Sequence, residues 1–169
     1  MRLTRPKRAF RLYSLFVLLS LAGCAIGQYA PSEKERGVSR QQLEERMGKP
    51  TGEWETPQGR VLEYARGPYG KNTYFITLDR QQQVQQWSQV LTLEQFEKIL
   101  PGMPADEVRR LIGRSFEIKS LARNRGEVWS YRFESVFCEW FEIEFTQEGT
   151  VRSKGMGIPP ECSFDDARD

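Results

Sequence analysis

The sequence predicts an α+β fold made of two tandem ααβββ-type units, each with short helices packed on one face of an antiparallel sheet. An internal repeat and the alternation of apolar residues within it support this prediction. Residues 37–48 match residues 102–113 at an offset of 65, and later segments match at an offset of 67. A chain of 169 residues with 38% apolar residues is long enough to form two small cores.

Each copy of the repeat begins with a predicted helix. In both copies a capping residue follows a glycine, apolar residues recur at helical spacing, and a second glycine ends the segment, which covers residues 39–47 and 104–112. A further helix is expected over residues 92–100, where a Thr and a Gln occupy capping-box positions and a proline follows. The first copy has a weaker counterpart of this helix.

Three strands are expected after the helices of each copy. Apolar and polar residues alternate in them, as expected for a sheet covered on one side. Turn-forming residues, mainly Gly, Pro and Asn, separate the strands. The matching segments are 61–64 with 128–131, 74–78 with 141–145, and Val84 with Val151.

Residues 93–113 carry a further resemblance, because a helix leads into Pro-Gly-Met and the next helix ends in Leu-Ile-Gly. This segment resembles the BamE/SmpA/OmlA family of outer-membrane lipoproteins. It also resembles the broader set of tandem domains built on the same unit, which includes the proteinaceous β-lactamase inhibitors. The match covers residues 37–157 and is strongest in the second copy. Two departures stand out: a BamE protein has one unit, and the proline usual after the final glycine occurs here only in the first copy, as Pro50.

The N-terminus has the organisation of a lipoprotein signal peptide. Residues 1–23 contain five basic residues and no acidic one, and residues 12–21 form a mainly apolar run. A bilayer-spanning helix needs about 20 apolar residues, so this run matches a signal-peptide core better. The Leu-Ala-Gly-Cys sequence at residues 21–24 resembles the bacterial lipobox, in which the cysteine accepts a diacylglyceryl group before cleavage. The alternative is an ordinary secretory signal followed by a chance cysteine.

Lipidation of Cys24 would decide where the protein resides. Two or three acyl chains, at about 0.8 kcal/mol per buried methylene, hold a protein on a membrane without a spanning helix. Ala25 follows the cysteine, whereas an aspartate there is the usual inner-membrane retention signal. The resemblance to lipoproteins therefore implies an outer-membrane protein that faces the periplasm.

The predicted organisation divides the chain into five segments. They are a signal peptide (1–23), a flexible tether (24–36), a first BamE-like repeat (37–90), a second repeat (91–157) and a C-terminal tail (158–169). The whole chain has 25 basic and 23 acidic residues, but five of the basic ones lie in the signal peptide, so the remainder is acidic. No nucleic-acid partner is expected for such a chain.

Cys138 and Cys162 form an even pair once Cys24 is acylated. In an oxidising compartment they are expected to form a disulfide, which would remove roughly 3.5 kcal/mol of unfolded-state entropy by closing a loop of about 25 residues. The alternatives are two free thiols or an intermolecular bridge.

Two aromatic residues are candidates for partner binding. By strand alternation, Phe75 and Trp140 point away from the helices, and exposed aromatic rings would anchor a partner. Alternatively, the two repeats pack these rings against each other, or the C-terminal tail covers Trp140. Cys138 shares the parity of Trp140, so a disulfide to Cys162 would draw the tail across this face.

Composition argues against catalysis. The chain has no histidine, which removes Ser-His-Asp and Cys-His nucleophile systems and His-ligated zinc, and we expect no catalytic residues, metal or cofactor. The family resemblance implies a non-enzymatic scaffold that contacts envelope proteins such as the β-barrel assembly machinery. Alternatives are an inhibitor of a periplasmic hydrolase, which would use loop 67–72 or 123–126, and a peptidoglycan-binding module that uses the aromatic residues.

Overall fold

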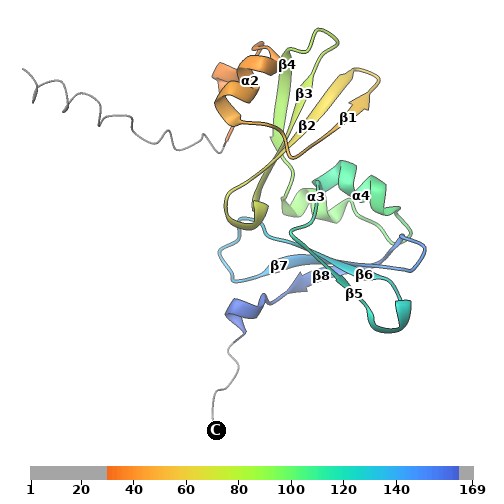
Figure 1. The fold of residues 1–169 in the computed structure, drawn as a ribbon. Helices are drawn as coiled ribbons and strands as arrows, with labels where there is room; N and C mark the ends of the chain where they lie inside the picture. Colours follow the sequence, from red (N-terminus) through yellow and green to blue (C-terminus); the bar gives the residue numbers. More distant parts are fainter. Residues whose placement is uncertain (1–29, 164–169) are drawn as a thin grey trace, which may run out of the picture.

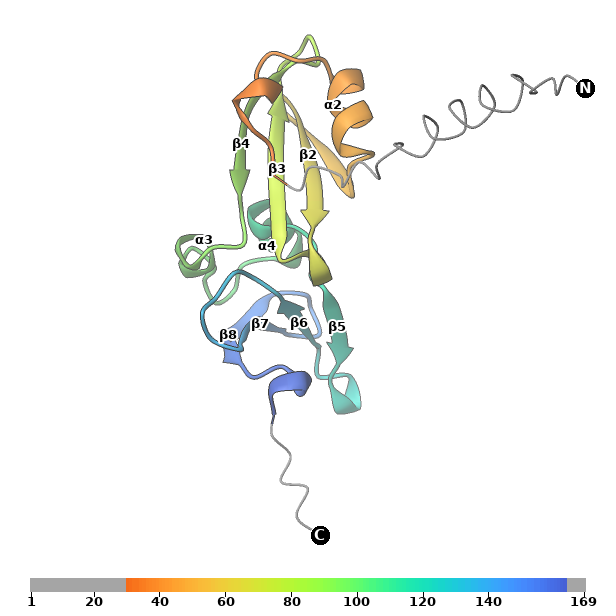
Figure 2. The ribbon, with the colours of Figure 1, turned by 90° about the vertical axis from the view of Figure 1, so that its left-hand side faces the viewer.

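The computed structural model describes residues 30–163 as two successive units, each built around an antiparallel four-stranded sheet (Figure 1). The predicted signal peptide, Cys24 and residues 164–169 lie outside the described residues. Figures 1 and 2 show the two helices of the second unit lying between the sheet of the first unit and their own sheet. The predicted α+β class with two tandem units is confirmed.

The two units contain three α-helices among the described residues. The first unit consists of α2 (Arg40–Met47), β1 (Gly52–Thr56), β2 (Gly59–Arg66), β3 (Asn72–Leu78) and β4 (Val84–Gln89). The second consists of α3 (Leu93–Glu97), α4 (Ala105–Ile112), β5 (Glu117–Ser120), β6 (Glu127–Tyr131), β7 (Trp140–Phe145) and β8 (Val151–Gly157). Short 3-10 turns are η1 (Glu33–Glu35), η2 (Pro68–Gly70), η3 (Ala122–Asn124) and η4 (Pro160–Cys162). Strand order in each sheet follows chain order.

Each sheet has one strand more than the sequence predicts. The additional strands, β1 and β5, are the first edge strands of their sheets and pair on one side only, with β2 and β6. Both are short and contain two charged residues each; β1 has a single large apolar residue, Trp54, and β5 a single one, Ile118, which is too little to identify a half-buried strand from sequence. The first unit also contains the 3-10 turn η1 where a weaker first helix was expected.

A separate apolar cluster lies under the helices of each unit. In the first unit, Leu43 and Met47 of α2 pack on the sheet. In the second, Phe96 of α3 stacks on Phe141 with ring centroids 4.0 Å apart and meets Phe133 edge-on at 5.2 Å. The buried sheet residues of the two clusters are Leu62, Tyr64, Ile76, Leu78 and Val84 in the first, and Trp129, Tyr131, Phe141, Ile143, Phe145 and Val151 in the second.

The internal repeat is reproduced in the backbone hydrogen bonds. The amide of Gly37 donates to the carbonyl of Val84, and the amide of Gly102 donates to that of Val151, both at 2.8 Å. Isolated β-bridges join Ser39 to Gln83 and Pro104 to Thr150. These pairs tie the start of α2 and of α4 to the last strand of the same unit, so the two copies fold alike in detail.

The change of offset from 65 to 67 lies at one hairpin turn. A short turn, residues 57–58, joins β1 to β2, because Thr56 pairs with Gly59. The longer turn that contains η3 joins β5 to β6. Gly59 and Gly126 occupy equivalent positions after the turn and both have positive φ, 152° and 120°. A Cβ atom at either position would overlap a carbonyl oxygen, of Leu78 or Phe145 respectively.

Polar and aromatic contacts join the two units. The buried carboxylate of Glu63 on β2 accepts a hydrogen bond from the amide of Arg114, just after α4, at 3.1 Å. Tyr69 of η2 contacts Phe116 with ring centroids 4.7 Å apart. Lys71 pairs with Glu134 at 3.0 Å. The second unit therefore covers part of the sheet face that α2 leaves open.

The end of the segment predicted to be a tether contacts the first unit. The Glu35 carboxylate is buried, accepts hydrogen bonds from the Ser32 side chain and backbone at 2.6 Å, and lies 3.5 Å from the Arg46 guanidinium. Burial alone would raise the pKa of Glu35, but these hydrogen bonds and Arg46 outweigh it and hold the pKa below its usual value. Residues 32–36 thus lie on the domain, with Arg36 donating to the carbonyl of Gln85 on β4 at 2.9 Å.

Replacement of Gly126 by Ala is expected to destabilise the protein by roughly 2–4 kcal/mol, because the new Cβ meets the Phe145 carbonyl and the positive φ is strained. Urea unfolding measures the change. The matched control is Gly155→Ala, since Gly155 lies in a strand with open space at its Cβ position, and it should change the free energy of unfolding by less than about 1 kcal/mol. Equal losses for the two variants would contradict the proposed packing of the turn.

Candidate functional site

The loop between β6 and β7 carries the most exposed apolar side chains of the described residues. Val136 is 94% exposed and Phe137 is 71% exposed. Hydrogen bonds inside the loop stabilise it. The Ser135 hydroxyl donates a hydrogen bond to the Glu139 carboxylate at 2.6 Å and accepts one from the backbone amide of Phe137 at 3.1 Å. Residues 134–139 are called the contact loop below.

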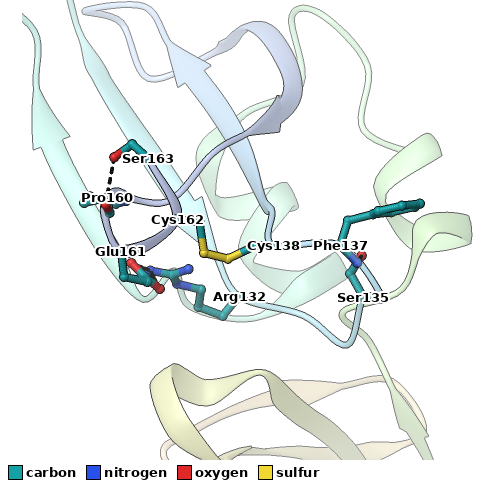
Figure 3. The surroundings of a disulfide bond; sticks show 8 residues. All are labelled: Arg132, Ser135, Phe137, Cys138, Pro160, Glu161, Cys162 and Ser163. Atoms are coloured by element: carbon teal, nitrogen blue, oxygen red, sulfur yellow. Dashed lines mark hydrogen bonds and ion pairs between the residues drawn. A yellow bond between two sulfur atoms is a disulfide. The ribbon is translucent and has the colours of Figure 1, made fainter. Parts of the chain in front are cut away.

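Both ends of the contact loop are fixed to the second unit. On one side, Phe133 is buried against Phe96 of α3. On the other side, Cys138 forms a disulfide with Cys162 of η4, with the two Cα atoms 6.1 Å apart (Figure 3). Figure 3 shows Phe137 pointing away from this disulfide. The apolar tip is thus presented by a loop that has little freedom to rearrange.

The C-terminal segment is attached by an ion pair as well as by the disulfide. The guanidinium of Arg132 lies 2.7 Å from the carboxylate of Glu161 (Figure 3). The hydrogen bond from Arg132 holds the pKa of Glu161 below its usual value. Within the segment, Ser163 donates its hydroxyl to the carbonyl of Pro160 at 2.7 Å.

Arg132 also connects three aromatic rings. Its guanidinium carbon lies 4.8 Å from the ring centroid of Trp140, 5.3 Å from that of Tyr69 and 5.7 Å from that of Phe116. Tyr69 belongs to the first unit, so this cluster joins both units and the C-terminal segment. Cation–π contacts of this kind contribute about 0.5–2 kcal/mol each.

The expectation that Phe75 and Trp140 are exposed is wrong. Phe75 is 9% exposed because it packs edge-on against Trp54, with centroids 4.8 Å apart, and joins a small cluster on the open face of the first sheet. Trp140 is 5% exposed and lies under Arg132 and Lys119. Neither ring is available to anchor a partner. The alternative that the tail closes over the Trp140 face fits better, since Glu161 binds Arg132 above that ring.

The loops named for an inhibitor differ in their surroundings. Loop 67–72 turns toward the second unit, where Tyr69 contacts Phe116 and Lys71 pairs with Glu134. In loop 123–126, Arg123 is exposed and has a φ of 62°. In loop 67–72, Tyr69 is 58% exposed, less than Val136 and Phe137 of the contact loop, and its ring already contacts Phe116.

The described surface has shallow hollows. A groove of about 240 Å³ runs between α3 and β8, and a hollow of about 250 Å³ lies over β7 and β8 with Glu142, Glu144 and Gly155 in its lining. Another, of about 380 Å³, lies between α2 and β1, with Arg40, Glu44 and Lys49 in its lining. Within residues 30–163, no group of three or more acidic or cysteine side chains is arranged to hold a metal ion. No helix in that range combines the length and apolar character needed to cross a bilayer.

Sequence reasoning missed Val136 and Phe137. Two adjacent apolar residues stand beside Cys138, between the segments predicted as strands at 128–131 and 141–145. Both residues lie outside the alternating segments and next to a cysteine that is expected to form a disulfide. These two features together would have identified an apolar loop with little conformational freedom.

Comparison with known proteins gives distant structural similarity only. No protein-family model and no curated protein matches the chain. The fold is similar to a "putative beta-lactamase inhibitor protein" from Streptococcus mutans, at 14% identity and a TM-score of 0.32, covering 89% of this chain and 97% of that one.

Two further solved structures match, both at a TM-score of 0.28. One is a DUF4309 family protein (YjgB) from Bacillus subtilis, at 9% identity over 78% of this chain and 86% of the other. The other is an extracellular protein containing an SCP domain from Bacillus anthracis, at 12% identity over 78% of this chain and 48% of the other. The resemblance to the BamE/SmpA/OmlA family remains a prediction from sequence.

Replacement of both Cys138 and Cys162 by Ser is expected to lower the free energy of unfolding by about 3.5 kcal/mol, because the disulfide closes a loop across 24 positions. Urea unfolding of the oxidised protein with and without a reductant measures the loss. The double variant, which has no disulfide, should be insensitive to the reductant. Reaction of either cysteine of the non-reduced protein with a thiol label would contradict the bridge.

Proposed function

We propose that the protein is a non-enzymatic protein-binding module of the bacterial envelope and that the contact loop is its binding surface. The observation that carries the proposal is the near-complete exposure of Val136 and Phe137 on a loop fixed at both ends. Exposed apolar side chains that are clustered and rigid bind partners well, because little conformational freedom is lost on association.

The chemistry of the contact loop favours a particular partner surface. Its apolar tip is flanked by two carboxylates, Glu134 and Glu139, of which Glu134 pairs with Lys71 across the junction of the two units. An apolar pocket with a basic rim complements such a loop. Envelope proteins, including those of the β-barrel assembly machinery, are the candidate partners under this proposal.

A fixed loop with an apolar tip is also the form needed to enter an enzyme cleft. Inhibition of a periplasmic hydrolase is therefore the second candidate function, with the contact loop in place of loops 67–72 and 123–126. The peptidoglycan-binding alternative depended on exposed Phe75 and Trp140, and the burial of both rings removes its basis.

We further propose that acylated Cys24 holds the module on the periplasmic face of the outer membrane. The lipobox-like sequence at residues 21–24 supports this. The first described residue, Ala30, is six positions after Cys24, and a chain of that length spans at most about 20 Å. The domain would then work close to the membrane surface.

Replacement of Cys24 by Ser is expected to remove the protein from the outer-membrane fraction, because the variant cannot be acylated and, since acylation precedes cleavage, keeps its apolar signal segment in the inner membrane. Fractionation and intact mass measure the change. The control is the Cys138→Ser/Cys162→Ser double variant, which should stay in the membrane and keep the mass increase of the acyl chains. Outer-membrane location of Cys24→Ser with the mass increase of the acyl chains retained would sink the anchor proposal.

A photo-reactive benzoylphenylalanine placed at position 137 is expected to crosslink one discrete envelope protein in living cells. The same probe at position 100, where Leu100 is 60% exposed in the segment after α3, serves as the matched control. Replacement of Val136 by Ser should weaken the adduct at 137 several-fold, because it removes half of the apolar tip.

Three outcomes would count against the contact loop: no adduct, the same adducts from positions 137 and 100, or an adduct at 137 that Val136→Ser leaves unchanged. Inhibition is tested separately with a panel of periplasmic hydrolases. An inhibited hydrolase that Phe137→Ser releases would identify the second candidate function.

A further inference from the structure

The edge of β8 is open over most of its length. Val151 pairs with the turn before α4, since its amide donates to Met103 and its carbonyl accepts from Gly102. From Arg152 to Gly157, no backbone hydrogen bond joins this outer edge to any other part of residues 30–163. An open strand edge carries unpaired amide and carbonyl groups that can pair with an added strand.

The equivalent edge of the first unit is partly covered. Arg36 donates a hydrogen bond to the carbonyl of Gln85 on β4 at 2.9 Å, and its guanidinium lies 5.3 Å from the ring centroid of Trp87. Arg36 therefore covers the edge of β4 near these two residues. No backbone hydrogen bond among the described residues covers the outer edge of β8 beyond Val151.

An apolar groove follows β8 on its helix side. Leu93 of α3 is 57% exposed and Met156 of β8 is 46% exposed, while buried Phe96 and Phe141 form the floor between them. Lys154 lies in the same lining, but its ammonium group donates to the carbonyls of Phe96 and Glu97 at 2.6 and 2.9 Å. The ammonium group is thus already engaged in two hydrogen bonds, and the exposed apolar side chains beside it suit apolar side chains of a partner.

On the opposite side of β8, two glycines leave the strand without side chains beside Glu142, while Arg152 and Ser153 both bind Glu144. Gly155 and Gly157 face Glu142 and Trp140 on β7, and the space above Gly155 is open. One oxygen of Glu142 accepts from Ser130 at 3.1 Å, whereas its other oxygen accepts no hydrogen bond from the described residues. A Cβ atom on Gly157 would lie 2.6 Å from that second oxygen, so the glycine leaves it uncovered.

We propose that β8 binds an extended segment of a partner protein as a fifth strand, with side chains that alternate between apolar and basic. Side chains of a strand point alternately to its two faces, so one set would enter the groove beside Leu93 and Met156. The other set would lie across Gly155. Adjacent strands are about 4.8 Å apart, so a Lys or Arg side chain on the added strand spans β8 and reaches Glu142.

This proposal goes beyond the contact loop and does not depend on it. The loop would bind through two exposed side chains, whereas β8 binds through backbone hydrogen bonds and a charge pattern. The two surfaces can therefore be tested separately on the same protein.

The probe is a synthetic seven-residue peptide of alternating Lys and Val, with both ends blocked. Titration calorimetry measures its affinity for the protein. That affinity should be about ten times higher than the affinity of a block peptide with the same composition, in which all Lys residues precede all Val residues. Two N-methylated versions of the peptide test the backbone pairing, one methylated at the odd-numbered residues and one at the even-numbered residues. Only one of them should lose binding, because the amides of alternate residues point to opposite edges of the added strand and only one edge pairs with β8.

Variants of the domain test the charge pairing. Glu142→Gln is expected to weaken the alternating peptide about fivefold, while the matched control Glu107→Gln on the exposed face of α4 leaves its affinity unchanged. Gly155→Val should weaken peptide binding by a similar factor, since the new side chain occupies the space between the added strand and Glu142. Valine is chosen because it is favourable in a strand. If Gly155→Val does not fold, Glu142→Gln alone carries this part of the test.

Equal affinity of the alternating and block peptides, or an unchanged affinity of Glu142→Gln, would overturn the proposal, as would peptide-induced NMR shifts centred on β1 or β4. The Val136→Ser/Phe137→Ser variant should bind the peptide with unaltered affinity. Loss of crosslinking at position 137 with intact peptide binding would therefore count against the contact loop alone.

Discussion

The architecture depends on a short backbone pairing that closes each unit. The chain just before α2 and just before α4 bonds to the first residue of the last strand, Gly37 to Val84 and Gly102 to Val151. This pairing places the helix across the sheet and brings its apolar side chains onto the alternating residues of the central strands. Each small core therefore forms from segments 47 or 49 positions apart, and neither helix is long enough to be stable without that core.

The second unit adds constraints that the first lacks. A disulfide and the Arg132 cluster attach the C-terminal segment, and the same contacts fix the loop that exposes Val136 and Phe137. These constraints act on one side of the sheet and leave the edge of β8 open. The two candidate binding surfaces thus arise where the second copy departs from the first, and not in the parts that the copies share.

Local signals in the sequence identified the helices and central strands, because capping residues, glycines and period-two alternation act over a few residues. They did not identify β1 and β5, whose formation depends on pairing with a neighbour. They placed Phe75 and Trp140 on the correct face but did not decide whether the rings are exposed, since parity shows which face a side chain is on but not what covers that face. Trp54, on an edge strand, and Arg132, in a loop, cover these rings from distant positions.

The sequence by itself determined the α+β class, the tandem repeat, the pairing of Cys138 with Cys162 as a candidate bridge, and the absence of imidazole chemistry. Tertiary structure alone decided which surfaces remain exposed. The physical reason is that exposure depends on long-range contacts: Arg36 covers the edge of β4 at Gln85 and Trp87, whereas no backbone hydrogen bond among residues 30–163 covers that of β8 beyond Val151. Two nearly equivalent strands acquire different surroundings because the segments beside them differ.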